Sequence, residues 1–314
     1  MPLSVHRRLR SVLVLLVFGA LHGACARGAS VTPMVAVEAS EQPRVQSNIL
    51  RADYVGSDAC RHCHADIYDA WKTSPMRRMT RRSDTAHVQA PFDGSVFRLG
   101  SDAVTMDTRR GRHFMRLISG AGYDALYRIT KIIGGRTRED YVGIDVTDAA
   151  DPLTDRGRGA ERVMPVSFVL YTQSWRYKGY SVMIPERPGL RVGAVWGATC
   201  IGCHNTLPYF TYLYDDLYGR GAPSYQGSIT DNLLPADRTW RWIIRDEPGL
   251  KHALAAELSF LNATVRDPDS NSLRDLLAET ISVTRRTLAD DHLVEVGIGC
   301  EACHGGSREH IEDH

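Results

Sequence analysis

The chain has 314 residues, 43% of them hydrophobic, and its formal net charge is +1 at pH 7. Removing residues 1–26, which contain three arginines and no Lys, Asp or Glu, changes that net charge to −2. Because a nearly neutral chain has no strong field of either sign, this composition excludes binding to nucleic acid or membrane surfaces by bulk charge, and the length fits one or two domains.

Residues 1–26 have the order of segments found in a secretory signal peptide. Basic residues come first, an apolar run follows at residues 12–18, and small residues precede Arg27. The run is too short to span a membrane, and Ala-Cys-Ala before Arg27 fits a cleavage site. Lipidation of Cys25 is the alternative, although His22 stands where a lipid-attachment signal prefers leucine. We expect export to the periplasm, as a soluble protein or as a membrane-anchored lipoprotein.

Residues 27–50 are rich in Ala, Val, Ser, Glu, Gln and Pro, without helical or strand periodicity. Such a composition is typical of a flexible segment. We therefore expect a flexible linker between the signal peptide and the first sequence motif.

The sequence Cys-x-x-Cys-His occurs three times, with spacings of 140 and then 100 residues. The three copies supply Cys60, Cys63 and His64, then Cys200, Cys203 and His204, then Cys300, Cys303 and His304. This is the attachment sequence for c-type haem: both thiols bond to the porphyrin, and the histidine becomes the proximal ligand of the iron. We expect three covalently bound haem c groups, and no disulfide, since the motifs use every cysteine after Cys25.

Two other uses of paired cysteines are weaker interpretations. Zinc sites need four ligands, and three Cys-x-x-Cys pairs do not divide into such sites without leaving ligands over. Zinc also does not require a histidine directly after every pair. A thioredoxin-like dithiol needs a single motif in a βαβ setting. Haem attachment uses both cysteines and the final histidine of all three motifs.

Periodicity predicts helices beside the first and third motifs and strands between the first and second. Residues 66–72 have Ile67, Ala70 and Trp71 on one helical face, and Pro75 ends the helix. Trp71 is either a lid on the first haem or an ordinary core aromatic. Helical periodicity returns at two later segments, and alternating apolar residues predict several antiparallel strands. The helices are expected at 248–262 and 272–288, and the strands at 95–99, 103–107, 113–118, 127–133 and 165–171.

These patterns divide the chain after the linker into three parts. Residues 51–91 form the first haem segment, residues 92–185 a β-rich insert, and residues 186–314 the second and third haem segments with connecting helices. The 288 residues after position 26 serve only three haems, so the polypeptide is long enough to build an apolar core of its own.

Residues 54–71 and 297–310, and more loosely 196–208, resemble bacterial multihaem c-type cytochromes. Similar proteins include tetrahaem electron-transfer cytochromes and haem modules joined to tetratricopeptide repeats. The resemblance implies electron transfer, and some relatives act on small nitrogen compounds. The fold class expected is α+β: a multihaem cytochrome c with helical haem-binding segments and an inserted antiparallel β-module. A fourth haem motif and a repeat domain are missing, and residues 74–79 lack the histidine usual after the tryptophan.

The second axial ligands of the irons have several candidates. The resemblance implies that His310 ligates a neighbouring haem, and Gly305-Gly306 permits the sharp reversal that this requires; otherwise His310 is a tail residue. Met76 or Met79 is a candidate to replace the histidine missing near the first haem, which would raise its potential, although methionines also fill cores. The other histidines considered are His87 and His292 as the better candidates, and His62, His113, His252 and His314 as the weaker ones.

A dense basic patch follows the first motif and has two interpretations. It consists of Lys72, Arg77, Arg78, Arg81 and Arg82. Such a patch either docks an acidic redox partner or captures a small anion, or it is simply solvated surface.

Three functions remain open. The favoured one is an exported three-haem cytochrome that transfers electrons between redox partner proteins. The second is a multihaem oxidoreductase acting on a small inorganic nitrogen compound, which needs one open iron and a nearby acid or base. The third is a haem-containing interaction or sensor module that binds through the β-rich insert. The sequence shows no open iron, so electron transfer is preferred to catalysis.

Overall fold

The computed structural model of this protein describes residues 48–178, 189–208, 246–264 and 267–313. The predicted signal peptide at residues 1–26, with Cys25, lies outside the described residues. So do His314 and all but the last three residues of the predicted linker at 27–50.

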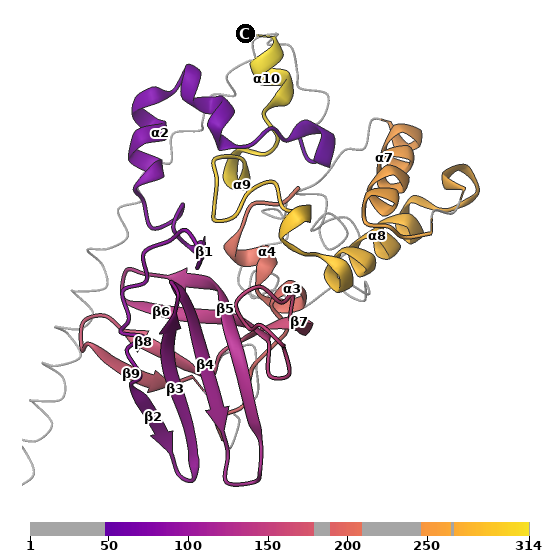
Figure 1. Ribbon diagram of the computed structural model, residues 1–314. Helices are drawn as coiled ribbons and strands as arrows, with labels where there is room; N and C mark the ends of the chain where they lie inside the picture. Colours follow the sequence, from indigo (N-terminus) through magenta and orange to yellow (C-terminus); the bar gives the residue numbers. More distant parts are fainter. Residues whose placement is uncertain (1–47, 179–188, 209–245, 265–266, 314) are drawn as a thin grey trace, which may run out of the picture. The chain divides into compact units, whose positions relative to one another are not determined.

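Nine strands form one antiparallel sheet (Figure 1). The main path runs β2-β3-β4-β5-β6-β8-β9, while β1 pairs with β5 and β7 with β6. The edge strands β2 and β9 approach each other, so the sheet nearly closes on itself. The strands are β1 Thr80–Arg82, β2 Val96–Leu99, β3 Asp102–Arg109, β4 Arg112–Ile118, β5 Asp124–Gly134, β6 Arg138–Asp145, β7 Arg158–Val163, β8 Val166–Val169 and β9 Ser174–Tyr177.

The β3–β4 hairpin shows how the sequence specifies this sheet. Buried residues alternate along β3, with Val104 and Met106 fully buried on one face. Arg110 and Gly111 form the two-residue turn with φ angles of 46° and 75°. Two successive positive φ angles are the signature of the tight hairpin turn that matches the twist of a sheet. The turn sets the register, in which Met106 lies opposite Met115.

The main hydrophobic core lies on the inner face of the curved sheet. Tyr141 and Phe168 are 0% and 1% exposed. Phe92 packs edge-on against Tyr141 and Trp175, with ring centroids 5.3 and 5.5 Å apart. Edge-to-face contacts of this kind add to the stabilisation from area burial. Other buried members of this core are Val104, Met106, Met115, Leu117, Ile129, Ile132, Met164 and Val166.

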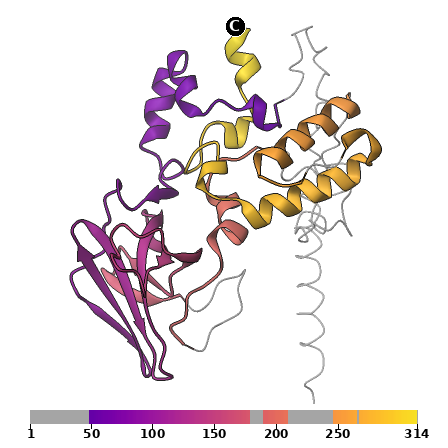
Figure 2. The ribbon, with the colours of Figure 1, turned by 45° about the vertical axis from the view of Figure 1, so that its right-hand side comes forward.

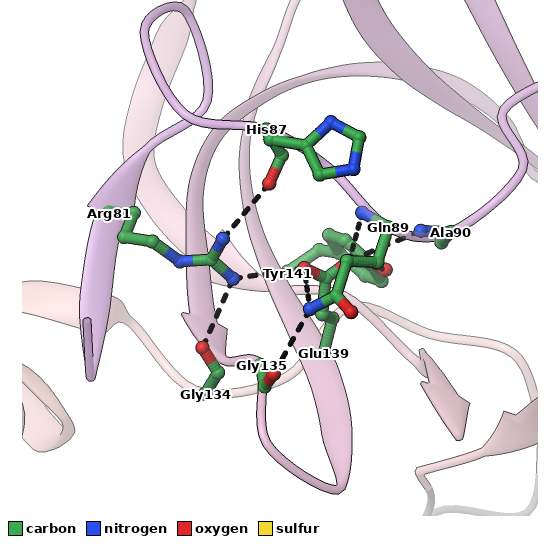
Figure 3. A network of polar contacts seen from close by, with 8 residues as sticks. All are labelled: Arg81, His87, Gln89, Ala90, Gly134, Gly135, Glu139 and Tyr141. Atoms are coloured by element: carbon green, nitrogen blue, oxygen red, sulfur yellow. Dashed lines mark hydrogen bonds and ion pairs between the residues drawn. The ribbon is translucent and has the colours of Figure 1, made fainter. Parts of the chain in front are cut away.

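A fully buried carboxylate, Glu139 on β6, joins the segment after β1 to the sheet (Figure 3). Arg81 Nη2 donates to Glu139 Oε1 at 2.9 Å, and Tyr141 Oη donates to Oε2 at 3.1 Å. The backbone N–H groups of Gln89 and Ala90 donate to the same carboxylate at 3.0 and 3.3 Å. Burial, followed by the nearby Glu139 charge, raises the pKa of Tyr141 well above its ordinary range. These hydrogen bonds replace the hydration that the Glu139 carboxylate loses on burial.

His113 on β4 makes the stability of the sheet sensitive to acid. Its ring packs edge-on against Phe92 at 4.8 Å, and burial lowers the pKa of its imidazole despite the opposing charge of Glu139. The folded protein therefore binds fewer protons than the unfolded chain between the lowered pKa and the ordinary value of about 6.5. We expect the free energy of unfolding to fall as the pH drops below that ordinary value.

The measurement is denaturant unfolding between pH 7.5 and about 5 for the parent and for His113→Gln, which has no titrating side chain at this position. The variant should lose part of the acid sensitivity, whereas His252→Gln, at an exposed histidine, should keep all of it. Identical pH profiles for His113→Gln and the parent would show that this imidazole does not control the stability.

Two longer helices, α7 Glu247–Phe260 and α8 Leu273–Thr287, lie side by side (Figures 1 and 2). The Asp246 side chain caps the first of them by accepting from the Gly249 N–H, and the Ser272 side chain caps the second by accepting from the Asp275 N–H. Leucines pack between the helices around the fully buried Leu277. Both helices fall where the apolar periodicity predicts them.

The remaining helices are short. They are η1 Arg51–Asp53, η2 Ser57–His62, α2 Ala65–Lys72, α3 Trp196–Thr199, α4 Ile201–His204, η4 Pro268–Ser270, η5 Asp290–His292, α9 Glu301–His304 and α10 Arg308–Glu312. Among the described residues, no helix combines the length and the apolar character needed to cross a membrane.

The predicted fold class, a multihaem cytochrome c with helical haem-binding segments and an inserted β-module, is wrong. The principal body is the nearly closed antiparallel sheet, and the helices at the motifs have four to eight residues. Within the described ranges, no group of three or more His, Cys, Asp or Glu side chains is placed to hold a metal ion. The attachment motif specifies a covalent bond and one ligand but not a fold, and helices this short are not stable by themselves.

Candidate haem sites

The first motif lies on η2 and leads directly into α2 (Figure 1). The turn is closed by the His64 N–H, which donates to the Cys60 carbonyl oxygen at 3.0 Å. Cys63 and His64 are exposed, while Cys60 is half-buried. The Cys63 thiol and the His64 imidazole are therefore both accessible from solvent.

Cys60 of the first motif lies beside Cys300 of the third. Burial, followed by the neighbouring Cys300 thiol, raises the pKa of Cys60 to about 11. Because the thiolate is the reactive form of cysteine, the raised pKa lowers the reactivity of this thiol in the folded chain.

Glu301, inside the third motif, joins the first motif to the C-terminal tail. The side chain is 1% exposed and accepts from the backbone N–H groups of Gly56 at 2.7 Å and Val55 at 3.1 Å. It also accepts from the N–H and the hydroxyl of Ser307, at 2.9 and 2.7 Å. Glu295 accepts from the Ser57 N–H at 3.2 Å. Burial raises the pKa of Glu295, although the hydrogen bonds from Ser57 lower it. Buried carboxylates thus fix the first motif against the third.

Replacing Glu301 with glutamine should lower the free energy of unfolding by about 1–3 kcal/mol. The amide nitrogen would face a backbone or hydroxyl donor where the carboxylate now offers an acceptor. Denaturant unfolding of the matured protein measures the effect, and Glu312→Gln, on an exposed side chain of α10, is the matched control. Equal stability of the two variants would contradict the role given to Glu301.

The second motif runs from Cys200, the C-cap of α3, through α4, and it is followed by residues that are fixed to the segment before the third motif. The Gly297 N–H donates to Asn205 Oδ1 at 3.0 Å. Thr206 Oγ1 donates to the Gly297 carbonyl at 3.0 Å and accepts from the Gly299 N–H at 2.7 Å. Residues 297–300 therefore contact Asn205 and Thr206, directly after the second motif, and Ser57, three residues before the first. The segments beside motifs that precede the third by 100 and 240 residues thus lie next to it.

His204 is half-buried beside Trp196, with ring centroids 6.3 Å apart. Burial, followed by the nearby Lys178 charge, lowers the pKa of His204, which favours the neutral form of the imidazole. Its buried Nδ1 atom has no hydrogen-bond partner among the described residues. A neutral imidazole is the form that ligates a metal.

Two cavities of about 570 Å³ each adjoin the second and third motifs. The third-motif cavity is lined by Cys303 and His304, together with Cys203 of the second motif and mainly apolar residues; the others include Tyr54, Met76, Leu207 and Ile298. The second-motif cavity adjoins His204 and is rich in arginine; its lining includes Met79, Arg78, Arg81, Arg136 and Arg138. Both volumes lie in the range typical of cofactor sites.

The residues present fit haem c. In each motif the first thiol is half-buried, the second thiol is exposed, and no cysteine in the described ranges forms a disulfide. Apolar walls suit the porphyrin ring, and arginines suit its two carboxylates. The cysteines are not gathered into a four-ligand arrangement of the kind that zinc requires. If haem is bound, Cys60, Cys200 and Cys300 with their partner cysteines are the residues that would attach it, and His64, His204 and His304 are the candidate proximal ligands.

The structure places the predicted second ligands in different surroundings. His310 on α10 lies near His64, with ring centroids 6.3 Å apart and ring planes 20° apart. His87 is exposed, and its carbonyl oxygen accepts from Arg81 (Figure 3). His292 caps η5 through Nδ1 and packs against Phe260. Met76 lines the third-motif cavity, and Met79 lines the second-motif cavity.

The weaker candidates have other positions. His113 is packed in the sheet against Phe92. His252 faces Asp269 at 3.4 Å on the surface, and His62 is exposed within the first motif.

Trp71 donates to the Ile298 carbonyl at 2.9 Å, so it links the first and third haem segments.

Most of the predicted basic patch is engaged within the chain. Arg77 donates to the Val296 carbonyl at 2.7 Å, and Arg81 binds Glu139. Arg82 lies 3.7 Å from Asp290. These three arginines link separate segments of the chain. The sequence alone could not distinguish them from a docking surface, because Val296, Glu139 and Asp290 lie far along the chain.

No protein-family model, curated protein or solved structure matches this chain in the comparisons.

Proposed function

We propose that this protein is an exported, periplasmic electron carrier with three covalently bound c-type haems, which passes electrons between redox partner proteins. Each Cys-x-x-Cys-His motif attaches one haem through its two thiols and ligates the iron through its histidine. By this attachment chemistry, rather than by its fold, the chain belongs with the multihaem c-type cytochromes that its sequence resembles.

The observation that carries the proposal is the convergence of the segments beside the three motifs on residues 295–300. The Cys300 N–H donates to Ser57 Oγ at 2.8 Å, which joins the third motif to the first. The Gly299 N–H donates to Thr206 Oγ1, which joins it to the second. Electron transfer between haems needs them close together in a fixed arrangement, and hydrogen bonds between the segments beside the three motifs support such an arrangement.

The signal peptide pattern at residues 1–26 supports export, and haem attachment in bacteria requires it. The sheet would act as the scaffold that fixes the second motif, since β1 and β5 flank the second-motif cavity through Arg81 and Ile133. This role accounts for the large share of the chain that carries no haem motif.

A spectroelectrochemical titration of the matured protein, combined with electron paramagnetic resonance, tests electron carriage. We expect three reversible one-electron steps, only low-spin irons in the oxidised protein, and no binding of carbon monoxide on reduction. A protein with three haems that does not exchange electrons with any mediator would contradict the proposal.

A second candidate function is reduction or oxidation of a small nitrogen-containing anion, favoured by the arginines around the second-motif cavity. Arginine side chains concentrate anions in such a cavity. This function requires an open iron at His204. Carbon monoxide binding to one haem of the native reduced protein, abolished by Cys203→Ala, would favour this candidate over the carrier.

A further inference from the structure

We propose that the second-motif cavity binds a small anion with at least two acidic groups, carboxylate or phosphate, held by Arg78 and Arg136. The cavity has a volume of about 570 Å³, which lies in the range of small-molecule sites. This inference goes beyond the proposed function, because the binding needs neither an iron nor an attached haem. It also differs from the second candidate function, in which an anion reacts at an open iron.

The first step is that no attachment cysteine lines this cavity. Its lining includes His204 but neither Cys200 nor Cys203. Cys203 lines the third-motif cavity instead, and Cys200 packs against the apolar cluster that contains Trp196. A porphyrin bonded to these two cysteines therefore does not account for the cavity beside His204, which is a separate space.

The second step is that the carboxylates at this cavity already have cationic partners. Glu139, which is 0% exposed, pairs with Arg81 at 2.9 Å and accepts from two backbone N–H groups (Figure 3). Asp140, which is 6% exposed, pairs with Lys178 and lies 3.4 Å from Arg138. Neither carboxylate is left to neutralise a further arginine.

The third step is that two arginines of the lining lack such a partner. Arg78 and Arg136 are exposed at the cavity, and neither guanidinium group has a hydrogen bond or an ion pair with any described residue. The cavity thus has an excess of positive charge that the described side chains do not neutralise. A cleft lined by charge of one sign concentrates ions of the opposite sign.

The fourth step is that the backbone that carries the two arginines is already fixed. The Met79 carbonyl, next to Arg78, accepts at 2.7 Å from the Gly134 N–H, two residues before Arg136. The pairing of β1 with β5 continues from this bond. The Gly135 N–H closes the turn between β5 and β6 by donating to a carbonyl of β6 at 2.8 Å. Binding therefore does not have to order these segments, which reduces its entropic cost.

The fifth step is the class of ligand. A guanidinium group donates in a planar fork that matches the oxygens of a carboxylate or a phosphate. Two such groups from neighbouring, hydrogen-bonded segments favour an anion with two acidic groups over a singly charged one. The Thr137 side chain, also in the lining, adds a hydroxyl that can donate to the same anion.

Isothermal titration calorimetry of the matured protein with citrate and with pyrophosphate tests the inference, and acetate is the singly charged comparison. The variants are Arg78→Gln, Arg136→Gln and the double variant. Both side chains are exposed, so folding should persist. The matched control is Arg98→Gln, which removes an exposed arginine of β2 that does not line this cavity.

We expect the parent and Arg98→Gln to bind citrate, pyrophosphate or both, and acetate at least about tenfold more weakly. Each single substitution should weaken binding by at least about tenfold, since hydrogen bonds to charged groups are the strong ones. The tighter of the two probes identifies the acidic group that the cavity prefers.

Failure of the parent to bind either probe, or equal affinity of the parent and the double variant, would overturn the inference. A double variant that shifts the potential of one haem, with no binding of either probe by the parent, would show instead that the arginines hold the carboxylates of that haem. Covalent haem is measured separately by intact mass, so the inference and the proposed function fail independently.

Discussion

Replacing Glu139 with alanine is expected to lower the free energy of unfolding by about 3–5 kcal/mol, the cost typical of removing one partner from a buried ion pair. Arg81, whose side chain is only 17% exposed, would lose its carboxylate partner. The N–H groups of Gln89 and Ala90 and the hydroxyl of Tyr141 would lose an acceptor in the same change. Denaturant unfolding of the matured protein measures this loss.

The matched control for Glu139 is Asp124→Ala. Asp124 pairs with Arg116 on the sheet surface, where both side chains are about half exposed. Exposed pairs contribute little to stability, so this variant should unfold almost as the parent does. Because Arg81 also lines the second-motif cavity, Glu139→Ala should alter the spectrum of one haem. A loss of stability no larger than that of the control would show that the network is not a stabilising element.

Replacing His310 with alanine should convert one low-spin haem to high-spin and create a site for carbon monoxide on reduction, while all three haems stay attached. The ring centroids of His64 and His310 are 6.3 Å apart, and the two ring planes are 20° apart. This proximity makes His310 the candidate for the second ligand of the first haem.

The tail is fixed so that His310 stays at this position. Arg308 donates to the Ala52 and Tyr54 carbonyl oxygens, and Ser307 donates to Glu301. The spectroscopic control is His252→Ala, at an exposed histidine that faces Asp269. If His310→Ala keeps the low-spin spectrum of the parent, His310 is a tail residue and the first haem has another second ligand.

The parts of the fold that the sequence predicts are those with local patterns. Alternation at residues 103–107 and 113–118 coincides with β3 and β4, because Val104 and Met106 face the core and Arg110-Gly111 forms the turn. The periodicity at 272–288 coincides with α8 for the same reason. A helix or strand that buries one face has a periodic pattern of apolar residues in its sequence.

The features that the sequence did not predict depend on contacts between residues far apart in the chain. Glu301 looks like a variable position inside an attachment motif, yet its partners Val55 and Gly56 lie about 245 residues away. Glu139 shows no sequence signal that separates it from a surface carboxylate. The near closure of the sheet and the contacts of residues 295–300 with the segments beside the earlier motifs likewise produce no periodic pattern in the sequence. The predicted fold class is wrong because the Cys-x-x-Cys-His motif specifies local chemistry and not the architecture around it.

The central claim, three covalent haems, is tested most directly by the intact mass of the protein purified from a host that attaches c-type haem, measured under denaturing conditions. The account predicts a mass equal to the processed polypeptide plus three haem groups, and a loss of one group in each of Cys63→Ala, Cys203→Ala and Cys303→Ala. A polypeptide without added haem, whose six motif cysteines all react with an alkylating reagent after denaturation, would contradict it.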